Sequence, residues 1–108
     1  MEHIELKYCV EIDLDTDLIL SGAESILKEH DNTVLQLSSR SYHYDTLSPH
    51  VFIQLALSKK QHRQENYMND LINKLKLHLM KVLPQDIPFS IEIRFLSPYY
   101  ASGKSTDS

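Results

Sequence analysis

One predicted strand carries the side chains best suited to bind an anion. Residues 34–44 alternate between two kinds of side chain, which predicts a strand with Arg40, Tyr42 and Tyr44 on one face. A guanidinium group binds carboxylates and phosphates through paired hydrogen bonds. Tyrosine and arginine are also residues that protein interfaces favour. The cluster therefore predicts either a site for a small anion, or a surface that another chain covers with Arg40 paired to an acid.

An acidic run could in principle bind a metal. Asp13, Asp15 and Asp17 have the ligand spacing of an EF-hand calcium loop, but Leu18 occupies the position that needs a glycine. A capped helix start explains the same acids. The six histidines show no paired ligand spacing on one helix face, and two glycines are too few for a Gly-rich phosphate loop. We therefore expect no metal and no cofactor.

The composition describes a single acidic domain. The chain has 108 residues, 42% of them hydrophobic, and a net charge of −4. Without a basic patch, nucleic-acid binding has no electrostatic support. No apolar run is long enough to cross a bilayer, and the acidic, alternating N-terminus is unlike a signal peptide, so we expect no membrane partner. Cys9 is the only cysteine, which excludes an internal disulfide and favours a cytoplasmic protein.

Three further segments have strand patterns. Residues 3–12 and 89–95 alternate between apolar and polar side chains. Residues 51–57 are apolar at nearly every position, which predicts a central strand covered on both faces. Pro49 before this segment and the polar run 58–60 after it leave too little length for a helix.

Two segments have helical periodicity. The first follows the acidic run and ends near Asn32, and the second covers about 63–83 and stops at Pro84. The resulting order, β-α-β-β-α-β, predicts an α+β fold made of two right-handed βαβ units. Its four-stranded mixed sheet would have both helices on one face. We expect one domain over residues 1–98, a short turn over 45–49 and a loose polar tail over 99–108.

Such a sheet leaves its second face without helices. Polar and aromatic side chains from several strands are expected there, drawn from His3, Glu5, Arg40, Tyr42, Tyr44, Phe52 and Gln54. A face of this mixture favours contact with another copy of the chain.

Four short stretches together resemble a known family. They are His3-Ile4-Glu5-Leu6-Lys7-Tyr8, Leu37-Ser38-Ser39-Arg40, the run from Phe52 to Leu57 with Arg63 beyond it, and Phe89-Ser90-Ile91-Glu92-Ile93. In order and spacing, they resemble the 5-carboxymethyl-2-hydroxymuconate isomerases of the tautomerase superfamily. The resemblance extends to about Pro98.

The resemblance implies a homotrimer and a reaction. The family isomerises small dicarboxylate or tricarboxylate dienols from enol to keto form in aromatic catabolism, without metal or cofactor. An N-terminal proline is its base, and arginines hold the substrate carboxylates. By resemblance, Arg40 and Arg63 would hold the anion. His3 and Gln54 would lie in the same substrate site, and Tyr42, on the same strand face as Arg40, is expected to join them.

The sequence departs from the family where the chemistry occurs. Glu2 stands at the proline position, and Met1 before a large charged residue is expected to remain. The base would then be the α-amino group of Met1 or the carboxylate of Glu2, and we expect weak or absent isomerase activity. Two alternatives stay open. One is a non-catalytic trimer that binds a small anion or serves only assembly, and the other is a ferredoxin-like binding module with the same element order.

Overall fold

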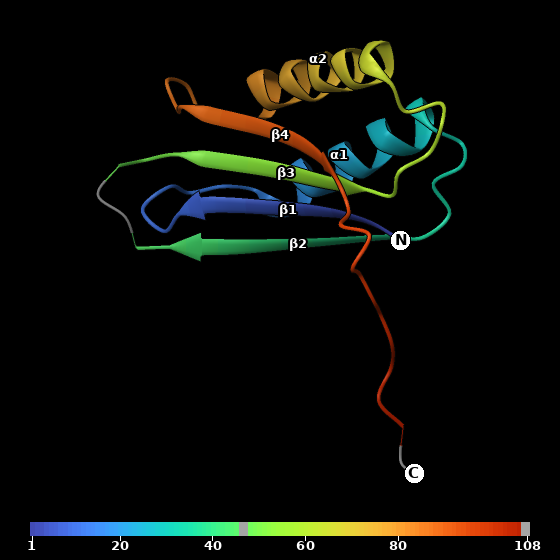
Figure 1. Cartoon of the computed structure of the whole chain (residues 1–108). Coiled ribbons are helices and arrows are strands. Elements are labelled where there is room, and N and C mark those ends of the chain that lie inside the picture. The colour runs from blue at the N-terminus through green and yellow to red at the C-terminus, as the bar shows by residue number, and fades with distance from the viewer. Residues whose placement is uncertain (46–47, 107–108) are drawn as a thin grey trace.

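The chain folds as a four-stranded sheet with two helices on one face (Figure 1). The computed structural model describes residues 1–45 and 48–106. Part of the expected turn, at 46–47, and the last two residues of the expected tail, 107–108, lie outside the described residues. The elements are β1 (Glu2–Cys9), α1 (Thr16–His30), β2 (Leu37–Tyr44), β3 (Val51–Leu57), α2 (Glu65–Val82) and β4 (Phe89–Phe95).

The strand order confirms the predicted fold. The sheet runs β2-β1-β3-β4, with β1 parallel to β2, β3 parallel to β4, and β1 antiparallel to β3. Each helix therefore connects two parallel neighbours, as a βαβ unit requires. The antiparallel pairing of β1 with β3 joins the two units into one mixed sheet.

The core lies between the sheet and the helices. Ile4 of β1 is opposite Leu55 of β3, and Leu6 is opposite Ile53; all four are at most 1% exposed. The helices add buried stripes at helical spacing, Ile19, Ala23 and Leu27 from α1 and Leu71, Leu75 and Leu79 from α2. Burial of each large aliphatic side chain contributes roughly 1.5–3 kcal/mol.

The acidic run caps the first helix. The side chain of Asp15 accepts a hydrogen bond of 3.0 Å from the backbone N–H of Leu18, which is an N-cap contact. The helix ends one residue earlier than predicted, at a C-cap formed by Asp31. The second helix begins two residues later than predicted, at Glu65.

Two strands are shorter than their sequence patterns. The first strand stops at Cys9 because Ile12 turns back and donates its N–H to the Cys9 carbonyl at 3.0 Å. The strand predicted from residue 34 begins at Leu37, and Leu35 before it is 87% exposed. An alternating pattern cannot separate a strand from an extended loop that leads into it.

The prediction that β3 is covered on both faces is wrong for the single chain. Its odd-numbered residues, from Val51 to Leu57, are buried against the helices, whereas Phe52, Gln54 and Ala56 are only partly buried on the opposite face. We call this second face the open face of the sheet. Within the described part of the chain, no helix is long and apolar enough to cross a membrane.

Candidate functional site

Strand pairing gathers polar side chains at one end of the open face. The register places Ser38, His3, Ala56 and Arg94 side by side across the four strands. The next row holds Arg40, Glu5, Gln54 and Glu92. Because cross-strand partners on one face lie roughly 4.5–5.5 Å apart, these rows form a continuous polar surface.

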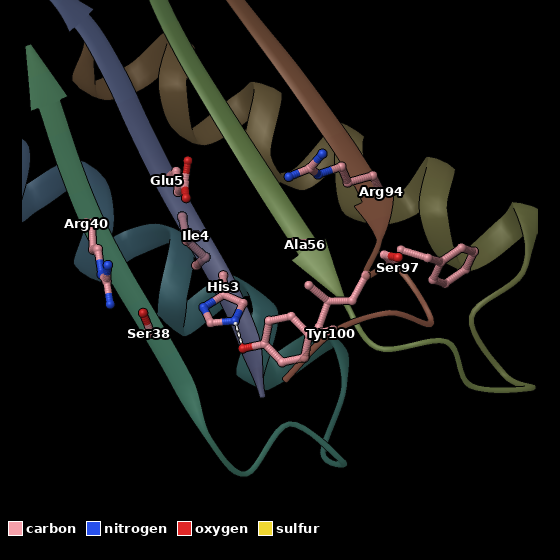
Figure 2. A pocket seen from close by; sticks show the side chains of 11 residues that line it. His3, Ile4, Glu5, Ser38, Arg40, Ala56, Arg94, Ser97 and Tyr100 are labelled. Atoms are coloured by element: carbon pink, nitrogen blue, oxygen red, sulfur yellow. Dashed lines mark hydrogen bonds between the residues drawn. The ribbon is translucent and has the colours of Figure 1, made fainter. Parts of the chain in front are cut away.

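The first row, together with Arg40 and Glu5 of the second, lines a cavity of about 470 Å³. Arg40 comes from β2 and Arg94 from β4, so the two guanidinium groups enter from opposite edges of the sheet. In Figure 2 the two arginines lie on strands to either side of His3, with Arg94 extending toward β3 and Arg40 running along β2. Ser38, Ser97 and Glu5 add polar groups to the wall.

The segment after β4 forms another wall of the cavity. Leu96 donates its N–H to the carbonyl of Leu57 at 2.8 Å, which continues the β3–β4 pairing past the last strand residue. The chain then crosses the ends of the strands near the N-terminus (Figure 1). Tyr100 reaches His3, with its Oη 2.8 Å from Nε2 and the two rings edge to face. The expected loose tail is therefore held against the sheet at Tyr100.

Three of the predicted binding residues occupy different places. His3 lies in the cavity. Gln54 lies in the second row and donates to the carboxylate of Glu92 at 2.8 Å. Tyr42 lies one row further from the cavity, opposite Lys7.

Arg63 lies apart from Arg40, in a buried ion-pair cluster on the helix side of the sheet. It is 2% exposed, its Nη1 is 3.2 Å from Oε1 of Glu2, and its Nε is 2.9 Å from Oδ2 of Asp31. Nη1 also donates to the carbonyl of Ser58 at 2.7 Å. With these donors engaged inside the chain, the guanidinium group does not line the cavity that contains Arg40. Arg40 and Arg63, which the sequence predicted to hold the same anion, therefore lie in different parts of the structure.

Glu2 also belongs to this buried ion-pair cluster. Burial would raise the pKa of Glu2, but hydrogen bonds from the backbone and hydroxyl of Ser58 and the charge of Arg63 outweigh it and lower the pKa. Its side chain is 5% exposed on the helix side, away from the cavity. A buried carboxylate with a lowered pKa is a poor proton acceptor near neutral pH.

Asp31 is the centre of the cluster. Its carboxylate accepts hydrogen bonds from Thr33, Tyr67, His62 and Arg63 at 2.6–3.0 Å. Burial opposes its ionisation, yet these donors hold the pKa of Asp31 well below its usual range. Burial and the neighbouring carboxylate raise the pKa of Tyr67. The hydrogen bonds and ion pairs of this cluster therefore stabilise the fold.

Met1 lies beside the cavity. It contributes to a neighbouring hollow with Ser58 and Lys59, and Tyr100 is shared by both hollows. The Met1 amine is therefore not among the groups that line the site of Arg40 and Arg94. Among the described residues, no three His, Cys, Asp or Glu side chains are grouped to hold a metal ion.

Sequence reasoning missed Arg94 and Tyr100. Alternation in 89–95 already places Ser90, Glu92 and Arg94 on one face, so the outward position of Arg94 was readable. Its proximity to His3 depends on β4 pairing with β3, which no local pattern encodes. The sequence around Tyr100 carries no signal that could have revealed its contact with His3.

Solved structures share this architecture at low sequence identity. A 5-carboxymethyl-2-hydroxymuconate isomerase from Deinococcus radiodurans R1 superposes with a TM-score of 0.70 at 15% identity, over 97% of this chain and 90% of the other. A 5-carboxymethyl-2-hydroxymuconate delta-isomerase gives 0.64 at 16% identity, over 97% and 89%. A fused 4-OT symmetric trimer gives 0.68 at 11%, over 94% and 93%. The chain has the tautomerase fold.

The tautomerase fold agrees with the resemblance of the four sequence stretches. Neither a protein-family model nor a curated protein sequence matches the chain. The fold is therefore established by structure, and the activity has to be argued from the cavity itself.

Proposed function

We propose that the chain is a cofactor-free tautomerase-type protein that binds a small dicarboxylate or tricarboxylate dienol and isomerises it slowly from enol to keto form. The observation that carries the proposal is that Arg40 and Arg94 line one cavity, which also contains His3. The similar structures include proteins described as 5-carboxymethyl-2-hydroxymuconate isomerases. In this proposal Arg94 takes the role that the sequence assigned to Arg63.

The two arginines suit a molecule with a carboxylate at each end. Each guanidinium group can form paired, charge-assisted hydrogen bonds with one carboxylate. The carboxylate of Glu5 opposes anion binding, but Lys7 lies 3.6 Å from it and offsets part of its charge. As the enol loses its hydroxyl proton, negative charge spreads toward the carboxylates, where the guanidinium groups stabilise it.

Slow turnover follows from the N-terminal residues. Glu2 lies in the buried cluster, and Met1 borders a neighbouring hollow. Neither supplies the secondary amine of a proline at the cavity, and general-base catalysis tolerates little misplacement. We therefore expect a turnover rate below the roughly 1–10³ per second of typical enzymes.

We also propose that the chain assembles as a homotrimer in the cytoplasm. Two of the similar structures are described as symmetric trimers. The end of the open face away from the cavity carries Tyr42 and Tyr44, which are 38% and 50% exposed, beside the partly buried Phe52. Burying this aromatic end between copies would leave the polar end available for the anion.

The test of the proposed site is the binding of cis,cis-muconate, a dicarboxylate that has no enol and cannot react. Titration calorimetry on the parent, Arg40→Ala and Arg94→Ala should show a loss of affinity of roughly 10-fold or more in each variant, because hydrogen bonds to charged groups contribute about 1.5–3 kcal/mol. Lys76→Ala removes an exposed cation from α2 and should bind like the parent. A parent that does not bind muconate at millimolar concentration, or equal affinity in all four proteins, would refute the proposal.

A non-catalytic anion-binding trimer is the second candidate. The placement of Met1 and Glu2 outside the cavity favours it. Muconate binding that depends on both arginines, with no conversion of 5-carboxymethyl-2-hydroxymuconate by the parent, would select this candidate.

A further inference from the structure

We infer that His3 is the proton-transfer group of this cavity and that Tyr100 positions it. The inference rests on the proposed function, because it names the base of the same reaction. It starts from the contact between the ends of the described chain, the 2.8 Å hydrogen bond between Nε2 of His3 and Oη of Tyr100.

The location of His3 suits proton transfer. The register puts it between Ser38 of β2 and Ala56 of β3, in the row that ends at Arg94. In Figure 2 its ring lies between the two arginines that would hold the substrate carboxylates. A dicarboxylate that spans Arg40 and Arg94 would cross β1 beside His3 and Glu5. An imidazole is the side chain best matched to proton exchange near neutral pH.

Tyr100 occupies Nε2 of His3 and leaves Nδ1 for the substrate. In the tautomer in which Nε2–H donates to the tyrosine oxygen, Nδ1 carries the lone pair and can accept a proton. The edge-to-face contact of the two rings, with centroids 5.8 Å apart, further restricts the orientation of the imidazole. Tyr100 thus acts through His3 as a positioning residue.

The proton transfer balances without another reactant. Nδ1 takes the proton of the enol hydroxyl, and the electron pair of that O–H bond forms the carbonyl π bond. The π electrons of the enol C=C bond move along the diene to the terminal carbon. The imidazolium then returns a proton to that carbon, so one O–H bond breaks and one C–H bond forms.

Other groups near the cavity fit this role less well. The charged and titratable side chains that face His3 are Glu5 from its own strand, Arg40, Arg94 and Tyr100. The carboxylate of Glu5 is paired with the ammonium group of Lys7 at 3.6 Å. Arginine stays protonated. His3 is the imidazole of the cavity wall, and it is held by a hydrogen bond.

The experiment compares the parent with His3→Gln, Tyr100→Phe, Tyr99→Phe and Glu5→Gln. Conversion of 5-carboxymethyl-2-hydroxymuconate gives kcat and KM across pH 5 to 9, and muconate titration reports binding separately. His3→Gln should lower kcat by about 100-fold or more, should change the muconate Kd by less than about threefold, and should abolish the acidic limb of the kcat/KM profile. Tyr100→Phe should lower kcat by roughly fivefold, as expected for one lost neutral hydrogen bond. Tyr99, which is 95% exposed, provides the matched control and should change nothing.

Each contrary outcome has its own meaning. Parent-like kcat in His3→Gln, or an acidic limb that disappears in Glu5→Gln instead, would overturn the role of His3. A parent that binds muconate without turnover would also overturn it while leaving the anion site intact. Failure of the parent to bind muconate would refute the proposed function itself.

Discussion

Glu2 and Arg63 form a buried ion pair, with Oε1 and Nη1 3.2 Å apart and both side chains at most 5% exposed. The pair joins the first strand residue to the segment between β3 and α2. It also explains why neither residue enters the cavity of Arg40. The residue at the proline position of the resembled family is used here to hold the fold together.

Glu2→Gln should destabilise the protein by about 2 kcal/mol. Removing one member of a buried pair typically costs about 3–5 kcal/mol because the other charge is left uncompensated. The loss should be smaller here, since Asp31 still contacts Arg63. Urea denaturation gives the free energy of unfolding. Glu5→Gln removes the acid of the exposed pair with Lys7 and should change that free energy by less than about 1 kcal/mol. Equal effects of the two changes would contradict the structural role of Glu2.

Stability should fall steeply in acid through Asp31 and Glu2. Both carboxyl pKa values are lower in the folded chain than their ordinary values, so the unfolded chain binds more protons in acid. The stabilisation is complete above about pH 5 and declines as the pH falls below about 4, where unfolded carboxylates become protonated. The free energy of unfolding should be measured in urea between pH 3 and pH 6.

Asp31→Asn is the matching variant for the acid dependence. It should be less stable than the parent at pH 6 because Arg63 loses a charged partner. It should also show a shallower dependence between pH 3 and pH 5, since the most strongly shifted carboxylate is gone. An unchanged slope would mean that the acid sensitivity arises elsewhere.

Local patterns predicted the elements but not their long-range partners. The alternation of 89–95 and the apolar run 51–57 were sufficient to identify two strands, and the acids before α1 identified its cap. The ion pairs of Arg63 join it to residues 32 and 61 positions away, at Asp31 and Glu2. Such contacts depend on strand order and side-chain packing, which have no local sequence signature. For the same reason the sequence predicted Arg63 as the second anion-binding arginine, whereas the cavity contains Arg94.

The apolar run of β3 shows a different limit. All its residues avoid charge, so the sequence predicted cover on both faces, yet in the single chain only the helix face is covered. Phe52 and Ala56 on the open face explain the apolar pattern if another copy packs there. The apolar pattern is therefore the one expected if β3 is covered by the helices on one face and by another copy on the open face. In the single chain, only the helix face is covered.

Gly22→Ala should destabilise the contact between the helices. A Cβ atom at Gly22 of α1 would lie 2.1 Å from Cε1 of His78 on α2, far inside van der Waals contact. The imidazole cannot move freely, because Nε2 of His78 is 3.1 Å from the carbonyl of Ile19. Overpacking of this kind costs about 1–3 kcal/mol. Gly103→Ala meets no atom within 4 Å and serves as the control. Thermal unfolding that gives the same Tm for both variants would contradict the close approach.

Tyr42→Asp combined with Phe52→Asp should convert the proposed trimer into monomers. The two side chains flank Lys7 on adjacent strands at the aromatic end of the open face. Lys7 already lies 3.6 Å from Glu5 and cannot neutralise two further carboxylates, so the contact between copies would have to bury uncompensated charge, which costs several kcal/mol. Native mass spectrometry and light scattering at micromolar concentration should show trimer for the parent and monomer for the double variant. Leu77→Asp alters an exposed apolar residue on α2 and should remain trimeric. A monomeric parent would refute the trimer. A Leu77→Asp variant that dissociates would show that the contact between copies does not lie at the aromatic end of the open face.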